Sequence, residues 1–220
     1  MIDASRFSDV YNAPGKDLPI LKVKVDARAY VEGKAKEGKI TWTTISVGPF
    51  FDWGLVYNFL GFGMSPLSMQ SDVEHANNVI DLKNKGVTLF DGGNHLFHTT
   101  TLASIGQSVV GVLSHPTATE NKPTRVHDFF VTQKDILAIL EAELGPFTVQ
   151  DVVVTQLIER SNAGIARGEF TEANINGLLQ ACVYGAEGAT CRWSEDDDSV
   201  LLGLPKRDIK QEVKKVLATL

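Results

Sequence analysis

Residues Thr41–Leu60 read TWTTISVGPFFDWGLVYNFL, and the interpretation of the whole chain starts from them. Residues 41–47 are mostly β-branched or aromatic, which predicts a buried β-strand. Gly48-Pro49 ends the strand, because glycine permits a sharp turn and proline cannot donate to a β-ladder. Three aromatic residues follow and begin a predicted helix to about Leu60: Phe50, Phe51 and Trp53.

The turn after this strand is a candidate pocket wall. In α/β sheets, ligands bind outside the carboxyl ends of parallel strands, where such a turn and its aromatic side chains would lie. The alternative is that these aromatic residues are ordinary core, since large apolar side chains are most often buried.

Length and composition narrow the class of protein. The chain has 220 residues, which favours one domain, or one domain with a small lobe. The hydrophobic fraction of 43% is ordinary for a globular protein, and the net charge of −6 argues against a nucleic-acid surface. The acidic run Glu195–Asp198 predicts a solvated loop. With no signal peptide and no apolar run of roughly 20 residues, the expected location is the cytoplasm, with no membrane partner.

The remaining chain alternates predicted helices and strands. Residues 1–18 are expected to be a loop, and Cys182 and Cys191 are expected to be reduced thiols. Helices are predicted at 19–37, 102–113, 132–145, 155–166, 171–184 and 205–219, and further strands at 87–90, 125–131 and 147–154. Thr132 and Asp135 form a predicted capping box, and a threonine before Leu102 is a predicted N-cap. The pattern predicts an α/β fold with a helix-rich C-terminal lobe.

The sequence contains no glycine-rich dinucleotide-binding fingerprint. Gly61-Phe62-Gly63 has Pro66 where a third glycine would stand, and Asp91-Gly92-Gly93 precedes another extended segment. The residues therefore describe the rear of an α/β protein without a phosphate-binding front.

A set of ordered motifs resembles one family. The residues are Phe7-Ser8-Asp9, Asn12, Leu18-Pro19, Lys24, Tyr30-Val31-Glu32, Thr41-Trp42-Thr43, Gly48–Leu55 (GPFFDWGL), Asp91-Gly92-Gly93, Thr99–Ala103 (TTTLA), Leu113–Pro116 (LSHP) and Leu202–Pro205 (LGLP). Together they resemble the fungal NmrA-like, isoflavone-reductase-like proteins, which are atypical short-chain dehydrogenases. The resemblance covers nearly the whole chain except Gly63–Ile80 and the first few residues.

The resemblance implies that this chain is the C-terminal part of a Rossmann-like parallel sheet plus a helix-rich substrate-binding lobe. Family members begin with a Rossmann half that binds NADP or NAD through a GxxGxxG-type turn. That half is expected to be missing here, so binding of NADPH or NADH is expected to be weak or absent. The expected division is 1–62 as a partial Rossmann-like portion, 63–80 as an insert, and 81–220 as the rest of the sheet and the substrate-binding lobe.

The resemblance also implies the functional residues. The family uses a helix lysine as general acid and base, and its Lys-x-x-x-Arg-x-x-x-Glu run matches at Lys24. Lys22 is a nearby competitor, and without the family match a helix lysine is most often a solvated surface charge. Tyr30 and Lys34 also show the Tyr-x-x-x-Lys spacing of ordinary short-chain dehydrogenases, but further along the helix.

The strand end supplies the remaining predicted site residues. By the same resemblance, Val47, Gly48 and Pro49 would lie beside the nicotinamide, and Phe50, Phe51 and Trp53 would face the substrate. No metal is expected, because His95 and His98 fall in an extended segment without a matching carboxylate.

The segment Gly63–Ile80 interrupts a stretch that family members join directly, from Gly61-Phe62 to Asp81-Leu82-Lys83. Its 18 residues correspond to about the length of a short fungal intron, and its codons can encode a splice donor, a branch point and an acceptor. We hypothesise a translated, unspliced intron that is poorly packed, the alternative being a genuine lineage-specific loop. A mature transcript that retains these codons would contradict the intron hypothesis.

Two functions remain open. The first is an NAD(P)H-dependent oxidoreductase acting on a small, aromatic substrate, present as a truncated chain with impaired cofactor binding. The second is a non-catalytic NmrA-like regulator that senses dinucleotide or binds a protein. A homodimer is a possible assembly.

Overall fold

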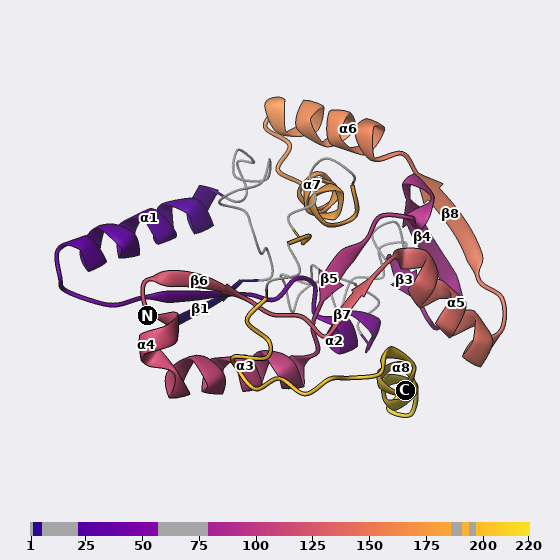
Figure 1. Cartoon of the computed structure of the whole chain (residues 1–220). Coiled ribbons are helices and arrows are strands. Elements are labelled where there is room, and N and C mark those ends of the chain that lie inside the picture. The colour runs from indigo at the N-terminus through magenta and orange to yellow at the C-terminus, as the bar shows by residue number, and fades with distance from the viewer. Residues whose placement is uncertain (1, 6–21, 57–78, 186–190, 194–196) are drawn as a thin grey trace.

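The computed structural model describes residues 2–5, 22–56, 79–185, 191–193 and 197–220 (Figure 1). Its first sheet is parallel, in the order β1-β2-β6, with β1 at Ile2–Ser5, β2 at Thr43–Ser46 and β6 at Lys122–Arg125. Ile2 lies opposite Thr43, and Thr43 lies opposite Lys122. The strand β1 corrects the expectation that residues 1–18 form only a loop, because pairing with β2 gives this short segment its backbone partners.

Helix α1 (Lys22–Lys36) makes the crossover from β1 to β2. The predicted helix over 19–37 is confirmed from Lys22 onward, and its earlier residues lie outside the described part. Figure 1 shows the last turn of α1 beside the start of β2, so its first turn points toward the carboxyl end of the sheet. This direction is the usual one for a helix that joins two parallel strands.

Two further sheets follow, one of three strands and one of two. The second has the order β3-β4-β8, formed by Ile80–Asp81, Gly86–Phe90 and Thr148–Val152. Strand β3 is antiparallel to β4, and β8 is parallel to it. The third pairs β5 (Phe97–Thr99) with β7 (Phe129–Val131) in antiparallel fashion.

The single strand predicted over 125–131 is therefore wrong. The chain stays in the parallel sheet only to Val126, whose N–H donates to the Ser46 carbonyl over 2.9 Å. It then turns and pairs with β5 as β7. Local β propensity cannot show this change of sheet, because it depends on partners distant in sequence.

The helices predicted over 102–113, 132–145, 155–166 and 171–184 agree with the structure to within one residue at each end. The short helix at Pro116–Thr119 was not predicted, and residues 57–60 of the predicted aromatic helix lie outside the described part. The helices are α2 (Phe51–Val56), α3 (Leu102–Ser114), α4 (Pro116–Thr119), α5 (Gln133–Leu144), α6 (Val154–Ala166), α7 (Glu172–Tyr184) and α8 (Ile209–Leu217), with a 3₁₀ turn, η4, at Asp91–Gly93. Thr101 caps α3, and the Thr132–Asp135 capping box of α5 is confirmed in both directions. Helix α8 begins later than predicted, because Asp208 is its N-cap. None of the helices in the described residues is long and apolar enough to cross a membrane.

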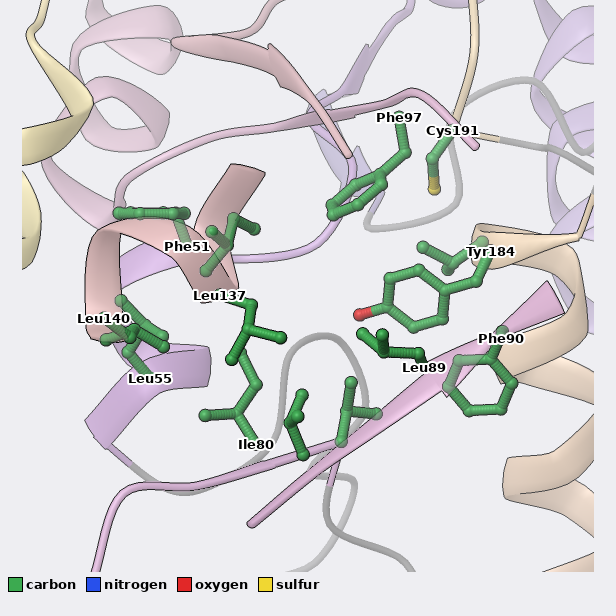
Figure 2. Packing of buried hydrophobic residues seen from close by; sticks show 14 of the residues in the cluster. Phe51, Leu55, Ile80, Leu89, Phe90, Phe97, Leu137, Leu140, Tyr184 and Cys191 are labelled. Atoms are coloured by element: carbon green, nitrogen blue, oxygen red, sulfur yellow. The ribbon is translucent and has the colours of Figure 1, made fainter. Parts of the chain in front are cut away.

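The main core joins the second and third sheets to the C-terminal helices. Phe51 packs edge-on against Phe129, with ring centroids 4.8 Å apart. Figure 2 shows Tyr184 between Phe97 and Phe90, and its ring centroid is 5.1 Å from each. The predicted reduced thiols, Cys182 and Cys191, are both buried, and the two do not form a disulfide.

A smaller core ties the parallel sheet to α3. Its buried members are Ile45, Val47, Val112, Val126 and Leu202. Val47 and Val126 stand at the carboxyl ends of β2 and β6, so this core holds the end of the sheet where a ligand is expected.

Of the predicted insert, residues 63–80, the structure describes only Val79 and Ile80. Val79 and Ile80 are 1% and 3% exposed, and Ile80 pairs with Val87 in β3 and β4. The expectation of poor packing is wrong for these two residues, since they contribute apolar surface to the main core. The rest of the segment, 63–78, lies outside the described residues.

Candidate functional site

Gly48 makes the sharp turn that ends β2. Its φ is +65°, and a Cβ built on it would lie 2.2 Å from the carbonyl oxygen of His98. Two conditions thus require glycine here, a left-handed backbone conformation and close contact with a neighbouring backbone. Val47 is fully buried and Pro49 is also buried, so the predicted cofactor-binding residues form a tightly packed strand end. Their contact with a nicotinamide stays a prediction.

The segment Thr99–Thr101 fastens this turn. The Thr100 hydroxyl donates to the Val47 carbonyl over 2.5 Å, and the Thr99 hydroxyl donates to the Pro49 carbonyl over 2.8 Å. The backbone adds a bond from the Thr100 N–H to the Pro49 carbonyl at 3.1 Å and one from the Phe51 N–H to the Thr100 carbonyl at 2.9 Å. A turn held by four hydrogen bonds, with both threonines fully buried, presents fixed groups to a ligand.

The three predicted aromatic contacts divide into two environments. Phe51 is 0% exposed and lies in the main core, as the ordinary-core alternative has it. Phe50 and Trp53 are half-buried, so their rings retain surface for a ligand. Asp52, between them, accepts a hydrogen bond from the Leu102 N–H at 3.0 Å and so joins α2 to the start of α3. The substrate roles of all three aromatic residues stay predictions.

Lys24 lies in the first turn of α1 and is half-buried. Because α1 is the crossover between β1 and β2, this turn belongs to the same end of the sheet as Gly48. The competitor Lys22 is more exposed, at 70% of its side chain, and pairs with Asp26 over 2.8 Å. The topology thus places Lys24 at the predicted end, and its catalytic role stays a prediction.

His98 is the centre of a buried ring stack beside the turn. Trp193 stacks on it at 4.2 Å and 11°, and Phe130 stacks on it at 4.2 Å and 19°. Burial, and after it the nearby His127, lowers the pKa of His98 to about 3. His98 is therefore neutral near pH 7, and its Nδ1 lies 3.2 Å from the Cys191 carbonyl oxygen and 3.4 Å from the backbone nitrogen of Trp193.

The two histidines considered as metal ligands, His95 and His98, have different surroundings. His95 faces Asp91 at 3.8 Å, whereas His98 is enclosed by rings. Within the described part of the chain, no group of three or more histidine, cysteine, aspartate or glutamate side chains is arranged to hold a metal ion.

His127 and Asp197 form a contact that sequence reasoning missed. Nδ1 of His127 touches Oδ2 of Asp197, and the two side chains are 25% and 9% exposed. The Ser199 N–H and hydroxyl donate to the same carboxylate over 2.9 and 3.0 Å. The expectation of a solvated loop over 195–198 is wrong for Asp197, because two donors of Ser199 and the contact with His127 replace water at its carboxylate, and residues 195 and 196 lie outside the described part.

Asp128 anchors the chain immediately after His127. Its side chain is 1% exposed, accepts from the N–H and hydroxyl of Thr101 at 2.8 and 2.7 Å, and accepts from the Ser104 hydroxyl at 2.7 Å. The Arg207 guanidinium lies 3.5 Å away and balances its charge. This hub fixes the backbone from which His127 projects.

Sequence comparison finds fungal oxidoreductases, while no family model matches the chain. The chain is 31% identical over 187 residues to oxidoreductase poxI of Penicillium oxalicum, covering 80% of this chain and 52% of that protein. It is 24% identical over 208 residues to oxidoreductase aprR of Aspergillus flavus, covering 92% and 62%. The chain thus spans roughly half to two thirds of the length of these relatives.

Structure comparison finds reductases of one fold. An isoflavone reductase has a TM-score of 0.60 at 16% identity, covering 89% of this chain and 58% of that one. A leucoanthocyanidin reductase–NADPH complex from Vitis vinifera has a TM-score of 0.66 at 13% identity, covering 96% and 63%. A Citrobacter triphenylmethane reductase complexed with NADP(H) has a TM-score of 0.61 at 15% identity, covering 98% and 64%. The predicted α/β, Rossmann-like fold class and the resemblance to isoflavone-reductase-like proteins are both confirmed.

Proposed function

We propose that this chain is the substrate-binding and proton-handling part of an NADP(H)-dependent, isoflavone-reductase-like oxidoreductase. One observation carries the proposal: the first turn of α1 with Lys24, the Gly48 turn and the end of β6 belong to the same carboxyl end of a parallel sheet. That end is where ligands bind in open α/β sheets. The fungal relatives and the reductase neighbours support the same reaction class.

The half-buried aromatic residues at this end favour a flat, aromatic substrate. Phe50 and Trp53 are half-buried and flank Asp52 in the sequence. The Asp52 carboxylate accepts a hydrogen bond from the N–H of Leu102 at the start of α3. One structural neighbour, AtPrR2, was solved with NADP⁺ and (+)-pinoresinol, which is a substrate-sized aromatic molecule. NADPH, when bound, would supply the hydride. Lys24 would supply or remove the proton at the substrate oxygen as a general acid and base.

The alternative is a regulator that binds dinucleotide or a protein without turnover. The two proposals differ in whether the chain consumes NADPH, so the experiments below separate them.

NADPH is expected to bind this 220-residue chain weakly, with a Kd of about 1 mM or higher. The pyrophosphate of a dinucleotide is ordinarily held at a helix N-terminus behind a glycine-rich turn, and the sequence contains no such turn. A fluorescence titration with NADPH, with NADH in parallel, measures the Kd. Binding at about 1 μM would contradict the expectation.

Replacing Lys24 by alanine is expected to lower kcat by roughly 100-fold or more, because a positioned general acid contributes about that factor. The assay follows NADPH oxidation at millimolar coenzyme with aromatic enones and quinones as substrates. Lys22→Ala is the matched control on the same helix, since Lys22 is exposed and paired with Asp26.

Equal losses in the two lysine variants would contradict the role of Lys24. If the unmodified chain oxidises no NADPH with any of these substrates while it still binds the coenzyme, the regulator is the better account.

A further inference from the structure

We propose that His127, oriented by Asp197, exchanges a proton with an oxygen atom of the substrate at the carboxyl end of the parallel sheet. The inference rests on the proposed function, because it assigns a second proton-handling residue to the same substrate site. It concerns residues that neither the sequence pattern nor the family resemblance singled out.

His127 lies close to the Gly48 turn. His127 comes immediately after Val126, whose N–H pairs with Ser46 at the end of β2. Its ring centroid lies 4.4 Å from that of His98, and the His98 carbonyl packs against Gly48. His127 therefore shares the edge of the sheet with the turn that the proposed function uses.

The second argument is the arrangement of donor and acceptor. The carboxylate of Asp197 touches Nδ1 of His127 and is nearly buried, whereas the His127 side chain is 25% exposed. Burial alone would raise the pKa of Asp197, but the hydrogen bonds from His127 and Ser199 outweigh burial and lower it. An ionised carboxylate at Nδ1 fixes the ring orientation and leaves Nε2 for a ligand, as in other acid–base dyads.

The groups around the His127 ring differ in charge. His98 is neutral near pH 7, because its pKa is lowered to about 3, chiefly by burial. Asp197 and Arg192 act on His98 in opposite directions, since Asp197 raises its pKa and Arg192 lowers it, and Nε of Arg192 donates to the Leu96 carbonyl over 3.0 Å. The His127 ring therefore contacts the carboxylate of Asp197 at Nδ1 and the neutral ring of His98.

The proposed step transfers one proton between Nε2 of His127 and the substrate oxygen. NADPH, when bound, would supply hydride to a carbonyl or enone, and the substrate oxygen would then gain negative charge. The N–H bond at Nε2 of the His127 imidazolium breaks and an O–H bond forms, which leaves a neutral imidazole and an unchanged Asp197 carboxylate. With a phenol and no coenzyme, the reverse transfer produces a phenolate beside the imidazolium.

Para-nitrophenol tests the reverse transfer on the full chain without any coenzyme, because its phenolate has its own absorbance band. Bound to the unmodified protein at a pH near its own pKa, it is expected to show roughly a tenfold higher phenolate-to-phenol ratio than free in buffer, as a neighbouring cation favours the ionised form. His127→Gln should remove this increase, and Asp197→Asn, which keeps the imidazole, should reduce it. His95→Gln, which alters the other His–Asp pair of the described residues, should leave it unchanged.

Binding is followed separately by tryptophan fluorescence, so the two proposals fail in different ways. An unchanged phenolate ratio in a folded His127→Gln protein that still binds the phenol would overturn the role of His127 and leave the substrate site standing. Failure of the unmodified chain to bind the phenol would overturn both. A raised phenolate ratio without NADPH oxidation supports the proton transfer and counts against the reductase.

Discussion

Gly48→Ala is expected to destabilise the protein by about 3–5 kcal/mol. The new Cβ would lie 2.2 Å from the His98 carbonyl oxygen, and the backbone would have to keep a φ of +65°. The oxygen belongs to β5, whose pairing with β7 and whose bond from the His98 N–H to the Cys191 carbonyl resist displacement. The turn would have to move away from Thr99 and Thr100, which would break the hydrogen bonds that fasten it.

Urea unfolding measures this effect, and Gly38→Ala is its matched control. Gly38 has a φ of +72° but nothing within 4 Å of its Cβ position, so its substitution carries only the backbone cost of about 1–2 kcal/mol. The difference between the two variants is the cost of the clash with the His98 carbonyl. Equal destabilisation by the two substitutions would show that the close approach contributes nothing.

Acidification from about pH 7.5 to about pH 5 is expected to lower the free energy of unfolding by about 2 kcal/mol through His98 alone. Its pKa in the folded protein is about 3, lowered mainly by burial, against about 6.5 when unfolded. Above pH 6.5 both states are neutral and the stability is fully present. Below it the unfolded state takes up the proton first, so stability falls toward pH 3, by up to about 5 kcal/mol in total.

His98→Phe separates this contribution from those of other groups. Phenylalanine keeps a ring between Trp193 and Phe130, but it removes the ring nitrogen that contacts the Cys191 carbonyl and the Trp193 backbone nitrogen, at a pH-independent cost of about 1–3 kcal/mol. The variant should therefore lose less stability than the unmodified protein between pH 7.5 and 5. His115→Gln, at the exposed end of α3, should follow the unmodified protein. Parallel pH curves for the unmodified protein and His98→Phe would refute the assignment.

Features of the fold that depend on residues adjacent in the sequence could be predicted from it. The capping box at Thr132 and Asp135, the N-cap at Thr101 and the strand before Gly48 all follow from local chemistry, and the structure contains each of them. The separation of β6 from β7 could not be predicted in this way, because it depends on pairing with β2 and β5.

The candidate site shows the same division. Gly48 and its aromatic neighbours were identified because they adjoin one another in the sequence. The ring stack could not be identified, since it joins His98, His127 and Trp193 from three separate segments. His127 was concealed within a predicted strand, and Asp197 within an acidic run that reads as solvent-facing until Ser199 and His127 are seen to surround it.

The ring stack around His98 cannot be completed until Trp193 has been synthesised. The His98 contact with the Trp193 N–H joins residues 95 apart, and that between the Arg125 N–H and Asp198 spans 73. Such long-range closure is slow, because the intervening chain must be ordered before the contact forms. Until Cys191 and Trp193 have left the exit tunnel, the first part of the nascent chain has the Gly48 turn but not the cover over His98. Chaperones that bind exposed aromatic surface would meet the protein in that interval.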